Sequence, residues 1–164
     1  RLFFLQTMKH LVRMPEFTPK TTDYVQRVTD SFVRQAALAT MGARLVSVEP
    51  GRVIMEMDHN DRFTQQHGFV HAGVTTTVLD TACGYAAFSL MPADAGVLTV
   101  ELKTNLLAPA AGETFIFEGR VVKPGRTVTF CEGEAFAVNN GTRKRIATLS
   151  ATMMTVLGRD DVKS

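Results

Sequence analysis

The sequence has few cysteines, no long run of one charge and no uninterrupted apolar segment long enough to cross a membrane. Its two cysteines, Cys83 and Cys131, are too few for the disulfide framework of a small secreted protein. The formal net charge is +2, and no Lys- or Arg-rich stretch supplies the basic stripe that nucleic-acid binders carry. The longest weakly charged stretch contains Gly, Thr, His and one Asp, which fits a protein core better than lipid. These absences predict a cytoplasmic protein that binds neither nucleic acid nor a membrane.

The length of 164 residues predicts a single domain. Residues 1–18 are interpreted as an N-terminal tail or leader, because their apolar core is too short for a signal peptide. Residues 19–157 are expected to form the domain. Residues 158–164 read as a polar C-terminal tail.

Hydrophobic periodicity predicts an α+β fold in the order helix, two strands, helix, four strands. Residues 21–45 read as one amphipathic helix, with Thr21 or Thr22 as its cap and Gly42 at its end. The apolar helix over about 72–89 offers the one crossover that a parallel strand pair would need, so the sheet is expected to be mainly antiparallel. The simplest packing is a curved sheet wrapped around that helix, with the four late strands as a meander. These late strands are expected within 96–107, 113–123, 126–138 and 143–156.

Asp80 is the one charged residue between Phe63 and Ala93, inside the apolar helix. A buried carboxylate is costly unless its pKa rises or a partner binds it. One interpretation is structural, with Asp80 bonded to Thr76, Thr77 or Thr81 or facing a water-lined edge. The other is catalytic, with Asp80 acting as a base.

The start of the same helix suggests the catalytic interpretation. Gly68 and Gly73 leave little bulk there, and a helix N-terminus presents free N–H groups that can hold an oxyanion. Ala72 and Asp80 are 80 − 72 = 8 residues apart, or roughly 12 Å along the axis. Both groups must lie about 3 Å from one reacting carbonyl. The pairing therefore predicts a two-fold dimer with active sites shared between subunits.

The segment "QQHGFVHAGVTTTVLDTACGYAA" resembles the signature of the PaaI-like acyl-CoA thioesterases of the hotdog superfamily. In that signature an Asn or Gln, a Gly and a His-Gly-Gly precede an Asp seven residues after the last Gly. The resemblance extends over roughly residues 30–157. Ala72 stands where the first Gly is usual, and Gln65 replaces the commoner Asn. The matching positions are Gln65, Gly68, His71, Ala72, Gly73 and Asp80.

The resemblance implies the hotdog fold and hydrolysis of a coenzyme A thioester, without a cofactor or metal. It assigns Asp80 as general base or nucleophile and the Ala72 backbone N–H as the oxyanion donor. His71 and Gln65 match residues that place the carbonyl or the water, and Thr99 matches a hydroxyl residue near the acid. Gly73 is expected at the substrate. Family members are commonly dimers of dimers, which implies a homotetramer.

Three alternatives stay open beside this assignment. A hotdog module could bind acyl-CoA without catalysis, as a sensor or partner, although it would not need Asp80. A hotdog hydratase would need a His after Asp80, and none follows. His67 and His71 are four residues apart, but no third ligand lies nearby for a metal.

The phosphates of coenzyme A need cations, and two turns between the late strands supply them. Lys123, Gly125 and Arg126 are the preferred candidates, because Gly125 permits close backbone approach. The second group is Arg143, Lys144 and Arg145. Ordinary solvated turn charges would explain either group equally well.

Overall fold

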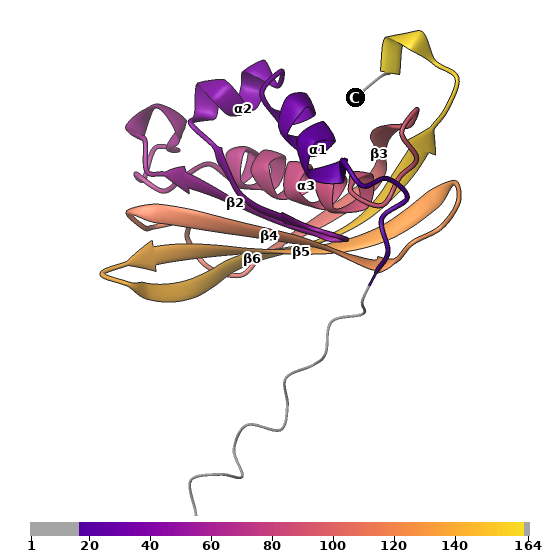
Figure 1. Cartoon of the computed structure of the whole chain (residues 1–164). Coiled ribbons are helices and arrows are strands. Elements are labelled where there is room, and N and C mark those ends of the chain that lie inside the picture. Colours follow the sequence, from indigo (N-terminus) through magenta and orange to yellow (C-terminus); the bar gives the residue numbers. More distant parts are fainter. Residues whose placement is uncertain (1–16, 163–164) are drawn as a thin grey trace, which may run out of the picture.

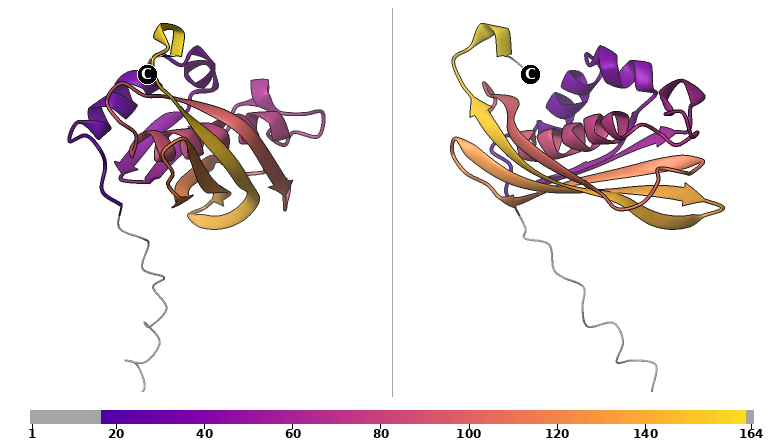
Figure 2. Two further views of the ribbon diagram at one scale, coloured as in Figure 1. Left: turned by 90° about the vertical axis from the view of Figure 1, so that its right-hand side faces the viewer. Right: turned by 180° about the vertical axis from the view of Figure 1, so that it is seen from behind.

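The computed structural model describes residues 17–162. A curved antiparallel sheet wraps around helix α3, and helices α1 and α2 lie over the side of α3 that faces away from the sheet (Figure 1). The sheet keeps this curvature in both views of Figure 2. The helices are α1 (Tyr24–Phe32), α2 (Ala36–Met41) and α3 (Ala72–Phe88), with short 3₁₀ turns η1 (Asp61–Phe63) and η2 (Asp160–Val162). The strands are β1 (Arg44–Glu49), β2 (Arg52–Asp58), β3 (Gly96–Leu106), β4 (Thr114–Lys123), β5 (Val128–Asn139) and β6 (Thr142–Val156).

The six strands follow the order β1-β2-β4-β5-β6-β3, and every pair is antiparallel. The antiparallel sheet, the central helix and the hotdog fold that they form are therefore confirmed. The prediction of a four-strand meander is wrong, because β3 pairs with β6 and not with β4. Helix α3 carries the chain from β2 to the far edge of the sheet, and residues 107–113 return it to place β4 beside β2. Only β4, β5 and β6 form a meander.

The predicted single N-terminal helix is divided in two. Gln35 is extended, with φ −82° and ψ 93°, between α1 and α2. Val28 and Leu38 are both buried, yet ten residues of one straight helix would place them about 80° apart around its axis. The break lets both side chains reach the core. Gly42 ends α2 in the left-handed conformation, as expected.

The cap of the first helix also differs from the prediction. Asp23 occupies the N-cap position of α1, and its side chain makes no capping hydrogen bond there. Thr21 and Thr22 lie before it. The hairpin at Pro50-Gly51 is confirmed, since β1 pairs with β2 around a Gly51 with φ +75°. Val53, Met55 and Met57 are its buried face.

Both ends of the described chain contact the domain. Phe17 packs against the core beside Gly51. At the other end, the Val162 backbone lies against Gly96 at the start of β3. Among residues 17–162, no helix has the length and apolar character needed to cross a bilayer.

Two glycines set how closely α3 approaches the sheet. Gly119 on β4 and Gly133 on β5 lie directly opposite each other. A Cβ on Gly119 would overlap the carbonyl of Ala82 and lie 2.5 Å from the backbone N of Cys83. A Cβ on Gly133 would instead lie 2.9 Å from the Cys83 Sγ and from a methyl of Leu79. The backbone of α3 thus rests on β4 where any side chain would displace it.

We expect Gly119→Ala to destabilise the fold more than Gly133→Ala. The first change forces two backbones apart and should lower the free energy of unfolding by about 3 kcal/mol, because overpacking of a rigid site costs this much. The second meets side chains that can turn aside and should cost roughly 1 kcal/mol. Urea unfolding of both variants measures the difference. Equal losses would contradict a backbone contact at Gly119.

Candidate active site

Asp80 lies in the middle of α3, and a residue of β3 forms a hydrogen bond with its carboxylate. The Thr99 hydroxyl donates a hydrogen bond of 2.9 Å to Asp80 Oδ1. Thr99 is an exposed residue of β3, and it lies opposite the buried Met153 in the β3–β6 ladder, which places its side chain on the sheet face toward α3. Strand β3, which follows α3 in the chain, therefore orients the Asp80 carboxylate through Thr99.

Asp80 is not bonded to a neighbouring threonine on its own helix, as one form of the structural interpretation expected. The hydroxyls of Thr77 and Thr81 donate to the carbonyls of Gly73 and Thr77, one turn earlier. The Thr76 hydroxyl bonds to Thr104 on β3 at 3.3 Å. Asp80 is thus bound by Thr99 and not by these threonines.

Partial burial raises the pKa of the Asp80 carboxyl above its ordinary value. Desolvation is the larger effect, since it disfavours the charged form. The hydrogen bond from Thr99 opposes it and lowers the pKa. The result is a carboxylate with more proton affinity than a solvated one, as a general base requires.

The N-terminus of α3 leaves one backbone donor available. His71 is the N-cap, and its Nδ1 accepts the Gly73 N–H at 3.0 Å. The N–H groups of Val74 and Thr75 donate to the His71 carbonyl. Among residues 17–162, the Ala72 N–H has no hydrogen-bond partner. Because Gly73 is occupied by the cap, Ala72 is the donor that remains for an oxyanion.

Gln65 belongs to the loop that leads into α3. Its backbone N–H donates to the Phe69 carbonyl at 2.8 Å, and its Oε1 accepts from the His67 backbone N–H. This loop brings Gln65 beside the start of α3. Gln65, His71 and Ala72 line one cavity of about 490 Å³, whose other walls come largely from residues 106–110.

The two halves of the predicted site line separate cavities in the protomer. Asp80 and Thr99 line a second cavity of about 150 Å³, with Gln35, Thr81, Gly84, Tyr85 and Val97. Ala72 is the first residue of α3, and Asp80 lies at the middle of the same continuous helix. The geometry therefore agrees with the rise of roughly 12 Å expected for eight helical residues.

The hairpin between β4 and β5 carries Lys123, Gly125 and Arg126. Thr129, just after it, lies opposite Met153, which lies opposite Thr99. The hairpin is thus at the end of the sheet that holds Asp80. A Cβ on Gly125 would overlap the Val128 carbonyl, so the turn itself requires this glycine, whether or not a ligand approaches it.

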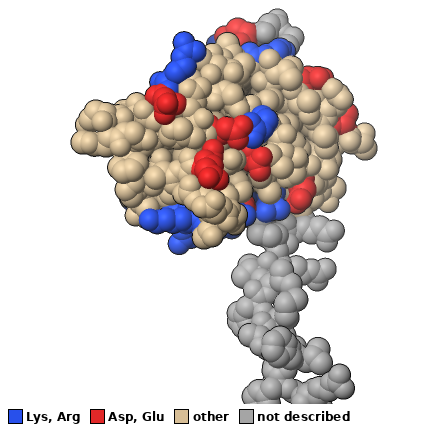
Figure 3. Space-filling model, turned by 90° about the vertical axis from the view of Figure 1, so that its left-hand side faces the viewer, with Lys and Arg blue, Asp and Glu red and all other residues tan. Residues whose placement is uncertain are grey.

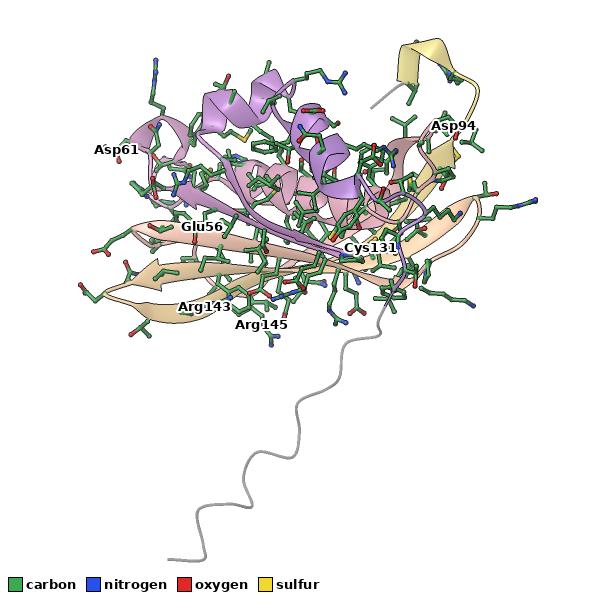
Figure 4. The ribbon with its side chains drawn as sticks, in the orientation of Figure 1. Glu56, Asp61, Asp94, Cys131, Arg143 and Arg145 are labelled. Atoms are coloured by element: carbon green, nitrogen blue, oxygen red, sulfur yellow. The ribbon has the colours of Figure 1, made fainter. Side chains whose placement is uncertain are left out.

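Two of the three alternative cations on β6 are paired with carboxylates, while Lys144 forms no ion pair among the described residues. Arg143 pairs with Glu118 at 2.6 Å and lies over the Phe136 ring, while Arg145 pairs with Glu134. Both arginines lie on the side of the sheet away from α3 (Figure 4). Lys123 and Arg126 form no ion pair within the described part of the chain. On the face shown in Figure 3, basic and acidic groups are interspersed.

Both cysteines are packing residues. Cys83 and Cys131 are fully buried and unpaired. Burial raises the pKa of the Cys83 thiol well above its ordinary value and that of Cys131 to about 12. A thiol that stays protonated is a poor nucleophile, so Cys83 does not compete with Asp80 for the chemistry.

Sequence reasoning missed Gln35 and Gly84, which line the cavity beside Asp80. Gly84 carries a usable signal, because it follows Asp80 by four residues and so lies on the same face of the helix. Gln35 has no such signal, because the hydrophobic periodicity of residues 21–45 continues through it as it would in one unbroken helix. Tyr85 belongs to both the core and the cavity, since it is 3% exposed and lines the cavity.

The chain matches known proteins over the segment that holds both halves of the site. Residues 67–144 match the model of the thioesterase superfamily. A thioesterase family protein from Silicibacter pomeroyi is 55% identical, with a TM-score of 0.81, over 82% of this chain and 99% of that one. The chain belongs to the thioesterase superfamily. It is therefore a member of a hydrolase family, and its hotdog fold is the fold of these relatives.

More distant relatives agree with this assignment. Acyl-coenzyme A thioesterase 13 of Homo sapiens is 33% identical over 104 residues, or 63% of this chain and 72% of that protein. The chain covers 66% to 72% of the length of three curated relatives. The E. coli PaaI protein of the phenylacetic acid degradation operon shares the fold at 20% identity, with a TM-score of 0.74 over 85% of this chain and 97% of that one. The resemblance inferred from the motif is confirmed.

We expect Asp80→Asn to leave the protein at least as stable as the native chain near neutral pH. Because burial raises the pKa of Asp80, its ionised form is less stable in the folded state than in the unfolded one. This loss of folding stability is present above the pKa of Asp80 in the folded state. It disappears below the pKa of Asp80 in the unfolded state, because Asp80 is then protonated in both states. Asparagine removes the charge but can still accept from Thr99.

Thermal unfolding checks this expectation. The Tm of Asp80→Asn should equal or exceed the native Tm at pH 7, and the difference should shrink as the pH falls. A markedly lower Tm at pH 7 would show that the carboxylate stabilises the fold, and the structural interpretation of Asp80 would return.

Proposed function

We propose that the chain hydrolyses the thioester of an acyl- or aryl-coenzyme A. One observation carries this proposal: a single helix holds a backbone N–H without a described partner at Ala72 and a threonine-bound carboxylate at Asp80. The first suits an oxyanion and the second activates a nucleophile. A curated relative named acyl-coenzyme A thioesterase supports coenzyme A as the thiol of the substrate.

The reaction needs three roles from these residues. Asp80 takes a proton from water while the water oxygen forms a bond to the thioester carbon. The Ala72 N–H stabilises the negative oxygen of the tetrahedral intermediate. The intermediate then breaks its C–S bond, and the departing thiolate recovers the proton from Asp80. Direct attack by Asp80, followed by hydrolysis of the anhydride, uses the same ionised carboxylate.

His71 and Gln65 are assigned to placing the carbonyl or the water. Because His71 Nδ1 accepts the Gly73 N–H, the ring proton of neutral His71 lies on Nε2, which is therefore a donor. Gln65 uses its Oε1 within the loop and retains its amide N–H groups. Gly73 has no side chain to crowd the first turn of α3, where a Cβ would lie 3.3 Å from His71 Nδ1.

A complete site needs two protomers. β3 is an edge strand, and Leu98, Val100 and Leu102 are 42%, 60% and 38% exposed along it. An unpaired edge with exposed apolar side chains favours pairing with another strand. Antiparallel pairing of two β3 strands would set two α3 helices antiparallel, with Ala72 of one near Asp80 of the other. We assign the homodimer to this edge and expect two such dimers to form a tetramer.

The coenzyme A phosphates are assigned to the hairpin that carries Lys123 and Arg126. These cations form no described ion pair and lie at the Asp80 end of the sheet. Such cations attract phosphate without first losing a carboxylate partner. We place the reaction in the cytoplasm, because a reducing compartment suits two unpaired thiols.

Thiol release from a panel of acyl- and aryl-CoAs tests the function. Native protein should hydrolyse at least one of them, and Asp80→Asn should lower kcat by about 1,000-fold, since a positioned base contributes this much. The native rate should fall as Asp80 takes up its proton, and its raised pKa places this fall above the range of a solvated Asp. Tight acyl-CoA binding without hydrolysis would instead indicate a non-catalytic module, the second reading of this fold.

Mixing two inactive variants tests the shared site. Ala72→Pro removes the N–H, and proline is tolerated at the first helical position after the extended His71. A dimer of one Ala72→Pro and one Asp80→Asn subunit would hold one doubly altered site and one intact site. Equal mixing after dissociation should restore about a quarter of the native activity, because half of the dimers are mixed and each has one active site of two.

Ala72→Ser serves as the control, because it keeps the N–H and should remain active. An absence of recovery, with mixed dimers shown by mass spectrometry, would place Ala72 and Asp80 in independent sites.

A further inference from the structure

The small cavity beside Asp80 extends along α3 away from Ala72. Asp80 and Gly84 are four residues apart and share one face of the helix. A Cβ on Gly84 would meet no atom within 4 Å, so the helix is open there. The volume of about 150 Å³ equals roughly five waters at ~30 Å³ each. In one protomer this space suits a short acyl group.

Gln35 and Tyr85, which both line this cavity, belong to one polar network. Gln35 Nε2 donates to the Tyr85 hydroxyl at 2.6 Å, and that hydroxyl donates to Ser31 Oγ at 3.2 Å. Tyr85 is almost fully buried, so the network fixes the Gln35 amide. Within residues 17–162, Gln35 Oε1 has no hydrogen-bond partner. It is an oriented acceptor in the wall of the cavity.

Gln35 lines the same cavity as Asp80, and its side chain is bonded to that of Tyr85, further along α3. Tyr85 follows Asp80 by five residues, or about 7.5 Å along the helix axis. Gln35 is bonded to the Tyr85 side chain and comes from the break between α1 and α2. An acyl group with its carbonyl at Asp80 would thus direct its far end toward Gln35.

We propose that Gln35 is a specificity-determining residue that accepts a hydrogen bond from a hydroxyl at the far end of a short acyl group. This inference rests on the proposed thioesterase function and names its substrate class. The lining contains one carboxylate, Asp80, and no cation. A second carboxylate on the acyl group would have no partner there and would lie near Asp80, which is costly. A neutral hydroxyl meets no such cost.

The test compares hexanoyl-CoA with 6-hydroxyhexanoyl-CoA, which differ only in the terminal hydroxyl. Native protein should prefer the hydroxylated substrate by roughly tenfold in kcat/KM, the effect of one well-placed neutral hydrogen bond. Gln35→Leu should remove this preference, so that the two substrates are hydrolysed with nearly equal kcat/KM. Tyr85→Phe, which removes the hydroxyl that holds the amide, should weaken the preference.

Gln26→Leu is the matched control, because Gln26 is an exposed residue of α1 bonded to Asp30. It should keep the native preference. Circular dichroism and thermal unfolding establish that each variant is folded. An equal preference in native protein and Gln35→Leu would overturn the role of Gln35, as would the absence of any preference in native protein. Failure of the native protein to hydrolyse any acyl-CoA would instead overturn the proposed function.

Discussion

The contact of α3 with two opposed glycines, through its backbone at Gly119 and its side chains at Gly133, is the constraint on which the rest of the structure depends. Gly119 and Gly133 let the turn at Ala82 and Cys83 lie directly on the sheet. That turn follows Asp80, so the contact fixes the height of the carboxylate above the strands. At this height the Thr99 hydroxyl lies 2.9 Å from Asp80 Oδ1. Packing of the most apolar helix and orientation of its one acid are therefore set by the same contact.

In the proposed mechanism, the length of the helix divides the catalytic groups between two protomers. An oxyanion donor needs the free first turn of a helix, and a carboxylate in a partly dehydrated site needs the helix interior. These two environments lie roughly 12 Å apart on one straight helix. A single chain cannot bring both to one carbonyl, so a protein that uses this helix for both must assemble. The exposed apolar edge of β3 offers the surface for that assembly.

Sequence reasoning reached the features that depend on local spacing. The bounds of α3, the isolation of Asp80, the end at Gly42 and the antiparallel sheet follow from short patterns. It failed for the features that are determined by contacts between residues far apart in the sequence. The helix break at Gln35 arises because both flanking segments must bury a side chain, and β3 joins the far edge because α3 spans the sheet. The in-strand glycines had a signal, since such a glycine often marks a close backbone approach, but only the strand register shows that Gly119 and Gly133 are opposite.

In the proposed mechanism, catalysis and selectivity depend on different elements of this fold. The groups assigned to catalysis lie on α3, on the loop before it and on β3. Gln35 lies between the two short helices that cover the other side of α3. If Gln35 recognises the acyl group as proposed, a substitution there would change the acyl pocket without altering the glycine contact or the Thr99–Asp80 bond. The helix break that sequence periodicity does not predict is then the place where substrate preference can change while the proposed catalytic geometry stays the same.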